Sequence, residues 1–283
     1  MTNVFNCLTI TFLKLDKCVI KPPISRLDFP NLTTFCMTNV TIDPATEFCV
    51  FKSPRLVVLH LIYCDGTQYL NIVSPRLESL YVSNSHYLVL NYFVNCNNLR
   101  RLRIRSDKLV DVLEPVESST LKKFFFQVAD TVQALNLDSL LLDLCCADTV
   151  RKMLPFSVSW LLHLSMIVDF RNLSRTSGAL LLIKSAPNLI TLVIWVYGAA
   201  EIAEAVSEYL KTPACLNQPL NKLKHVTLGL SGASESGLTF TKLLLSRTPS
   251  LVRMRTHGYK SSGYEEELLR FPRASPKAKL IIT

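Results

Sequence analysis

Hydrophobic residues recur along the chain in one spacing, L-x-x-L-x-L, which returns about every 20 to 30 residues. Two neighbouring segments, SPRLVVLHLIYC at 53–64 and SPRLESLYVSNS at 74–85, show the spacing in the same phase. Successive side chains of a β-strand point to opposite faces of a sheet. The x-L-x-L-x centre of each segment therefore predicts a short strand whose leucines enter a core and whose other residues face outward.

The same template fits eleven segments in near-regular phase. Their first hydrophobic positions are Ile10, Leu32, Leu56, Leu77, Leu99, Leu121, Leu137, Leu161, Leu189, Leu223 and Leu251. The step from Leu121 to Leu137 is the shortest, and residues 131–145 allow more than one register. Such a series is the signature of a leucine-rich repeat, whose units stack on their neighbours. We predict an α/β fold, a leucine-rich-repeat solenoid shaped as a curved horseshoe with a parallel sheet on its concave side.

The segments between the strands change character along the chain. A proline often precedes the first leucine, as in SPRL at 53 and TPSL at 248, and it suits the turn into a strand. The early connections are short and irregular, whereas residues 177–185, 201–211 and 235–248 have helical patterns. We therefore predict a convex side that is irregular first and helical later. Residues 277–283, KAKLIIT, predict a last strand that caps the sheet.

Composition narrows the protein class. The chain has 283 residues, of which 49% are hydrophobic and 19% charged, so a packed core is expected and disorder is not. The nine cysteines show no CxxC spacing, which favours buried thiols and an intracellular location, in the cytoplasm or nucleus. Residues 1–13 lack the basic start of a signal peptide, and the apolar stretch 189–200 is too short to span a bilayer. No membrane association is expected.

Catalytic signatures are weak, and we expect neither an enzyme nor a cofactor or metal. The five histidines are far apart and form no H-x-x-x-H pair. Cys145 occupies the C/N position of its repeat, as Cys64 does, which indicates a structural thiol. The segment GLSGASESG at 229–237 matches neither G-x-S-x-G nor a phosphate-binding loop. A turn with Ser234 as helix cap explains it.

Outward strand positions are the candidates for binding. The net charge of +9 favours acidic partners, and RLRIR at 101–105 places three arginines on one face. We predict a protein-binding face for an acidic or phosphorylated client, and a merely solvated sheet face is the competing interpretation. Nucleic acid is less favoured because no binding motif accompanies the charge. The candidate residues are His60, Tyr81, Arg101, Arg103, Arg105, Lys123, Phe125 and Trp195.

Three stretches resemble the plant F-box/FBD/LRR-repeat proteins. They are 13–42, which includes LKLDKCVIKPP and FPNLTTFCMTNVTI, 223–254, and the tail EELLRFPRASPKAKLIIT at 266–283. The resemblance implies leucine-rich repeats over 1–212 and an FBD-like region over 213–283 that caps the solenoid. It also implies a substrate receptor of an SCF-type ubiquitin ligase. Because the first repeat begins by Ile10, we expect the F-box to be missing, and a Skp-type adaptor to bind only if an F-box lies upstream. An interaction or decoy protein unrelated to ubiquitin is the alternative.

Overall fold

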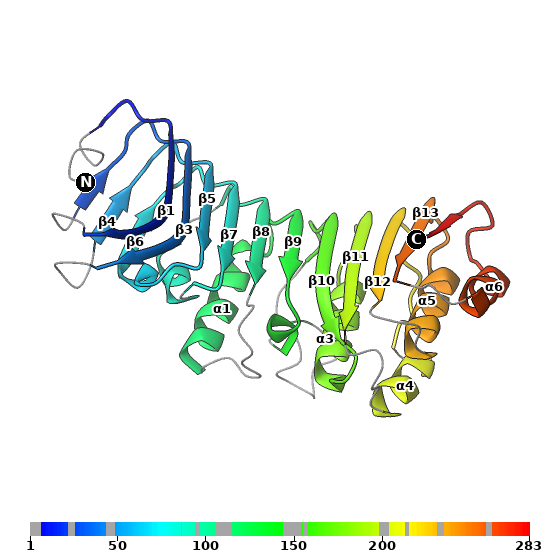
Figure 1. Ribbon diagram of the computed structural model, residues 1–283. Helices are drawn as coiled ribbons and strands as arrows, with labels where there is room; N and C mark the ends of the chain where they lie inside the picture. The colour runs from blue at the N-terminus through cyan, green and yellow to red at the C-terminus, as the bar shows by residue number, and fades with distance from the viewer. Residues whose placement is uncertain are drawn as a thin grey trace. The chain divides into compact units, whose positions relative to one another are not determined.

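The computed structural model describes residues 7–21, 26–43, 49–85, 87–93, 97–105, 115–143, 154, 158–197, 204–212, 215–230, 235–258 and 262–283. These residues form two compact units, Met1–Gln133 (unit 1) and Ala134–Thr283 (unit 2). Both units are built from parallel strands that alternate with short irregular, 3₁₀ or α-helical connections (Figure 1). The fold is therefore α/β, and it is the predicted leucine-rich-repeat solenoid.

Unit 1 contains a parallel sheet in the order β1-β3-β5-β7-β8. Each strand buries its alternate hydrophobic residues, and Leu56, Leu59, Leu61 and Leu77 are fully buried. The strands are β1 (Phe12–Ile20), β3 (Thr34–Ile42), β5 (Val58–Ile62), β7 (Ser79–Ser83) and β8 (Arg101–Arg105). The helices among the described connections of unit 1 are the 3₁₀ helices η2 (Thr67–Tyr69) and η3 (Tyr87–Tyr92) and the helix α1 (Pro115–Val128).

A backbone ladder fixes the register of the repeats. In each repeat, the residue directly after the first hydrophobic position donates its N–H to the backbone carbonyl of the equivalent residue in the repeat before. In unit 1 these bonds are Thr33→Thr11, Val57→Thr33, Glu78→Val57, Arg100→Glu78 and Gln133→Arg100, at 2.8–2.9 Å. In unit 2 they are Ile190→Leu162, Lys224→Ile190, Val252→Lys224 and Lys279→Val252, at 2.9–3.0 Å. One position per repeat is thus hydrogen-bonded in the same way along each unit.

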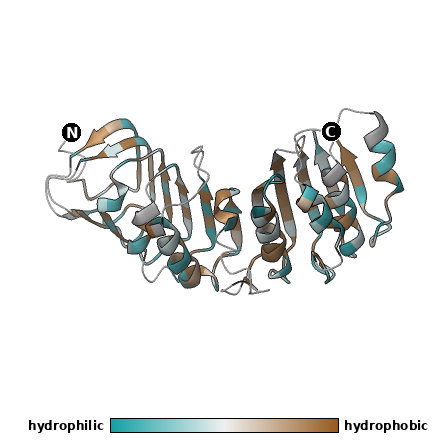
Figure 2. Cartoon of the chain, turned by 90° about the horizontal axis from the view of Figure 1, so that it is seen from below, coloured by the Kyte–Doolittle hydropathy of each residue, from teal (hydrophilic) through white to brown (hydrophobic). Residues whose placement is uncertain are grey.

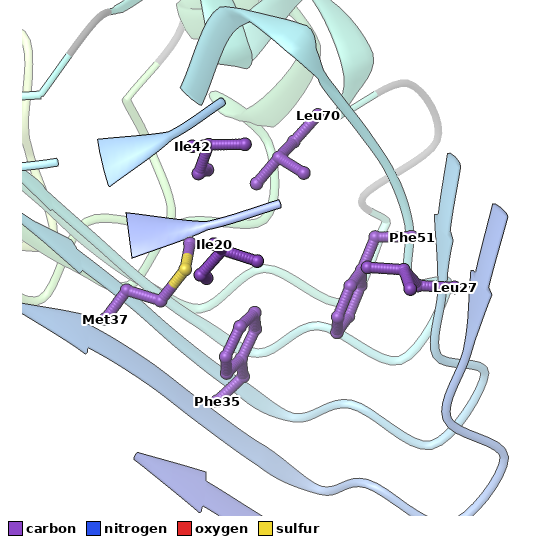
Figure 3. Close-up of a pocket in the computed structure, with 7 residues that line it drawn as sticks. All are labelled: Ile20, Leu27, Phe35, Met37, Ile42, Phe51 and Leu70. Carbon is purple, nitrogen blue, oxygen red and sulfur yellow. The ribbon is translucent and has the colours of Figure 1, made fainter. Parts of the chain in front are cut away.

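A second, three-stranded sheet packs against the buried side of the first strands in unit 1. It consists of β2 (Arg26–Asp28), β4 (Cys49–Lys52) and β6 (Leu70–Val73), which also run parallel. The ring of Phe51 stacks on Phe35 of β3 at 4.9 Å between centroids. Between the two sheets lies a cavity of ≈ 10 Å³ that seven hydrophobic side chains line (Figure 3). A gap of this size holds one water molecule at most and offers it no polar partner, so we regard it as a packing gap.

Unit 2 contains a parallel sheet in the order β9-β10-β11-β12-β13-β14. Its strands are β9 (Ala134–Leu137), β10 (His163–Asp169), β11 (Thr191–Tyr197), β12 (His225–Leu230), β13 (Arg253–His257) and β14 (Lys279–Ile282). The helices among its described residues are η4 (Leu140–Leu142), α3 (Leu173–Lys184), α4 (Glu204–Lys211), α5 (Glu235–Arg247) and α6 (Ser262–Arg270). The helices α3, α4 and α5 lie along one side of the strands (Figure 1). Hydrophobic and polar residues alternate along several strands (Figure 2).

The later part of the fold agrees with the predicted pattern. The helices α3, α4 and α5 fall on the three predicted helical segments, and β14 pairs in parallel with β13 as the predicted last strand. The helix α6 has no counterpart among the predicted elements. The division between the units lies at 133/134, and it does not test the predicted FBD-like region over 213–283, which stays a prediction. Cys145 and Ser234 lie outside the described residues.

Two of the eleven predicted strands are wrong. The segment that starts at Leu121 belongs to the helix α1, and the segment that starts at Leu137 begins where β9 ends and continues into η4. The first hydrophobic position of the repeat is Val132 instead of Leu121 or Leu137. The N–H of the next residue, Gln133, makes the ladder bond to the carbonyl of Arg100. One repeat with a long helical connection therefore replaces two short ones. The ambiguity arose because L-x-x-F-x-F also satisfies the i, i+3 spacing of a helix.

Candidate protein-binding faces

One row of side chains crosses the outward face of unit 1. Strand pairing places Cys36 beside His60, His60 beside Tyr81, and Tyr81 beside Arg103. The rings of His60 and Tyr81 meet edge to face at 5.6 Å, and Cζ of Arg103 lies 4.6 Å from the centroid of the Tyr81 ring. A guanidinium at this distance is attracted by the negative face of the ring. The row therefore holds Arg103 in a defined position over Tyr81.

Strand β8 brings three arginines to this face. Leu102 and Ile104 are buried, so Arg101, Arg103 and Arg105 point the other way. Arg101 lies beside Ser79 of β7, and Arg105 lies beside Ser83. None of the ion pairs between described residues involves Arg101 or Arg103. We call Tyr81, Arg101, Arg103 and Arg105 the arginine face of unit 1.

Burial and charge set the protonation of the row. Burial lowers the pKa of His60, and the nearby guanidinium of Arg103 lowers it further. Burial raises the pKa of the Cys36 thiol, and the positive charge of Lys14 offsets only part of that rise. The Sγ of Cys36 lies 3.7 Å from Nδ1 of His60. Both groups are therefore neutral at pH 7, and the pair is not a thiolate–imidazolium pair of the kind found in reactive thiols.

The titration of His60 tests this geometry. We expect an NMR titration to give His60 a ring pKa below 6.5, and the substitution Arg103→Gln to raise that pKa, because it removes a positive charge that opposes protonation. Lys123→Gln, on α1, is the matched control and should leave the pKa unchanged. Since folding lowers this pKa, the unfolded chain binds more protons below about pH 6.5, and stability should fall as the pH drops through that range. An unchanged His60 pKa in Arg103→Gln would contradict the assignment.

Lys123 and Phe125 do not belong to the predicted strand face. Both lie on α1, where Leu121, Phe124, Phe125 and Val128 are buried and Phe126 is 53% exposed. Burial of two adjacent residues followed by an exposed one fits a helix, and a strand would have buried Phe124 and Phe126 together. Phe125 is therefore a core residue, and Lys123 is an exposed residue of the helix.

In unit 2, Trp195 of β11 faces outward as predicted and is 48% exposed. It shares a row with Gly229 of β12 and His257 of β13. Its ring is nearly parallel to that of His257, at 15° and 5.8 Å between centroids, and Nδ1 of His257 lies 2.6 Å from Oγ1 of Thr283. A Cβ at Gly229 would lie 1.9 Å from an indole carbon of Trp195. The glycine is therefore what allows the indole to cross β12.

Sequence patterns missed both partners of Trp195. We predicted that residue 229 opens a turn, whereas Gly229 lies inside β12 and the strand ends at Leu230. A glycine inside a strand often marks a close approach of another group. Recognising Gly229 as a strand residue would therefore have indicated its contact with a neighbouring side chain. His257 offered no such signal, because its contact with Trp195 depends on the register of β11, β12 and β13.

The described residues offer little evidence of other kinds of site. They contain no group of three or more His, Cys, Asp or Glu side chains placed to hold a metal ion. Within the same residues, no helix combines the length and the hydrophobicity needed to cross a bilayer. The described cysteines are not joined in disulfides, and Cys49, Cys64 and Cys215 are buried.

Comparisons with known proteins add little to the geometry. No protein-family model matches the chain, and no curated protein matches it. Among the solved structures that resemble it is a chain from the crystal structure of the Rad7 and Elc1 complex in yeast. The identity is 14%, the match covers 89% of this chain and 75% of that chain, and the TM-score is 0.40. A likeness of this strength carries no argument about function. Any proposal about function therefore rests on the repeat ladder and the outward faces of the strands.

Proposed function

We propose that this chain is a non-enzymatic protein-recognition module that binds an acidic or phosphorylated segment of a partner on the arginine face of unit 1. The observation that carries the proposal is the guanidinium of Arg103 held over the ring of Tyr81, with Arg101 two residues before it on the same strand. Arginine forms paired hydrogen bonds with carboxylates and phosphates. A guanidinium that is already ordered loses less entropy when it binds.

The spacing of the arginines suits an extended peptide. Alternate residues of a strand lie roughly 6.7 Å apart, so Arg101, Arg103 and Arg105 match acidic groups on alternate residues of an extended partner. Nucleic acid is the less favoured ligand. Single-stranded nucleic acid stacks its bases on exposed aromatic rings, and the guanidinium of Arg103 already covers a face of Tyr81.

Charge reversal tests the proposal. Affinity purification with the double variant Arg101→Glu/Arg103→Glu should lose the partners that the unchanged chain retains, with affinity lower by about 100-fold or more, because attraction becomes repulsion. Lys123→Glu changes a charge on the exposed side of α1 and should retain the partners. Partners that bind all three proteins equally would refute the proposed face. An oligonucleotide shift at low salt that the double variant abolishes would favour a nucleic-acid binder instead.

The role of substrate receptor in an SCF-type ubiquitin ligase is a finer proposal, and it rests on the resemblance of residues 13–42, 223–254 and 266–283 to F-box/FBD/LRR-repeat proteins. Binding of a purified Skp-type adaptor to the natural full-length product would support it. If that product does not bind the adaptor but keeps its client, the chain is an interaction or decoy protein that is not linked to ubiquitin. The described cysteines, which are not joined in disulfides, agree with our proposal of an intracellular location.

A further inference from the structure

The outward face of unit 2 is basic at its last strands. Arg253 and Arg255 of β13 and Lys279 of β14 are exposed, and pairing aligns His225, Arg253 and Lys279 in one row. The segments 186–197, 215–230, 248–258 and 271–283, which form β11 to β14 and the turns before these strands, contain no Asp or Glu. None of the ion pairs between described residues involves Arg253, Arg255 or Lys279.

The same face is hydrophobic at its earlier strands. Trp195 shares β11 with Val193, which faces the same way two residues earlier, and it lies beside Ile167 of β10. Both aliphatic residues are partly exposed. An indole that is 48% exposed beside partly exposed aliphatic residues is the kind of anchor found at the centre of protein interfaces.

Gly229 and His257 connect the two halves. The indole lies over Gly229 and reaches His257, which shares β13 with Arg255 two residues away. Strands β11 and β13 are two strand spacings apart, roughly 10 Å, and three residues of an extended chain cover the same length. Because alternate side chains of an extended peptide face the same way, a peptide that crosses the strands would reach the anchor and the basic strands with side chains two or four positions apart.

We propose that the outward face of β10 to β14 is a second docking surface, which binds an acidic protein segment with a hydrophobic residue on Trp195 and carboxylates on Arg253, Arg255 and Lys279. Complementary charge supports an acidic occupant. The hydrophobic half supports a protein segment, because Ile167 and Val193 offer no ring on which successive bases could stack, and His257 already packs against the indole. This surface lies on unit 2 and shares no residue with the arginine face of unit 1.

Selection from a random library of 12-residue peptides, displayed on phage, tests the proposal with the full chain as bait. We expect peptides with a large hydrophobic residue two or four positions from Asp or Glu. They should bind Trp195→Ala and Arg253→Gln/Arg255→Gln at least about tenfold more weakly than the unchanged chain. They should bind Arg101→Glu/Arg103→Glu with unchanged affinity, which separates this surface from the proposed function.

Three results would overturn the proposal: selected peptides without acidic residues, binding that survives in both unit 2 variants, and displacement of the peptides by a twelve-nucleotide oligo(dT). We also expect phosphorylated peptides to bind no more than about tenfold tighter than the same peptides with aspartate. Tighter binding would show that the surface recognises a phosphate, and it would overturn the assignment of carboxylates to Arg253, Arg255 and Lys279. Trp195→Phe keeps an aromatic anchor and should retain most of the affinity. Because the substituted side chains are exposed, circular dichroism of the variants should match that of the unchanged chain.

Discussion

Replacing Gly66 by alanine should destabilise unit 1 by about 3 kcal/mol or more. Gly66 has a φ of 73°, and a Cβ at this position would lie 2.1 Å from the carbonyl oxygen of Ile42. The obstacle is backbone, so the strand itself must move. The movement would strain the bonds from Ile42 N–H to the Asp65 carbonyl and from Asp65 N–H to the Val40 carbonyl, at 2.9 and 3.0 Å. Native-state amide exchange at Ile42 and Asp65 measures the loss.

Asn39→Ala is the matched control for Gly66→Ala. Asn39 also has a positive φ, 52°, and it is exposed on β3 of the same unit. Alanine there carries only the cost of the left-handed conformation, about 1 kcal/mol. The difference between the two variants therefore isolates the contact with the Ile42 carbonyl. Equal losses in the two variants would show that the close approach at Gly66 is not important.

Replacing Phe125 by alanine should cost about 3 to 5 kcal/mol of stability, because the ring is buried on α1 and its loss leaves a cavity. Phe126→Ala, at an exposed ring of the same helix, should cost less than about 1 kcal/mol. Urea unfolding followed by circular dichroism measures both. Both tryptophans, Trp160 and Trp195, lie in unit 2, so their fluorescence reports the unfolding of that unit. It therefore distinguishes unfolding of unit 2 from the expected loss of stability in unit 1.

This pair of variants distinguishes the helix from the strand that the repeat pattern predicted. In the predicted strand Phe124 and Phe126 would be core residues and Phe125 would face outward. The order of the two losses would then be reversed, and Phe125→Ala would weaken partner binding with little effect on stability. A larger loss for Phe126→Ala would therefore contradict α1 as the structure has it.

The repeat pattern predicted most of the strands because burial of alternate leucines imposes a strict period of two on each short segment. It failed at Leu121 because a helix with Leu121, Phe124 and Phe125 on one side produces nearly the same letters. Only exposure of Phe126 and the ladder bond at Gln133 separate the two possibilities, and both depend on tertiary structure. Local spacing therefore suffices where a connection is short and polar, and fails where it is hydrophobic.

The candidate sites were predictable in part for a similar reason. Outward positions such as Arg101, Arg103 and Trp195 follow from alternation along a single strand. The contacts of Arg103 with Tyr81 and of Trp195 with His257 join residues of different repeats, and they require the register between strands. That register depends on connection lengths, which vary along this chain.

Photo-cross-linking can show whether the arginine face of unit 1 binds a protein. A photoreactive amino acid replaces Ser79, which faces outward beside Arg101, and in a second protein it replaces Val116, an exposed residue of α1. We expect a discrete protein adduct from position 79 that disappears when Arg101→Glu/Arg103→Glu is added, and no such adduct from position 116. An adduct at 79 that persists after charge reversal, or protein adducts from position 116 alone, would contradict this expectation.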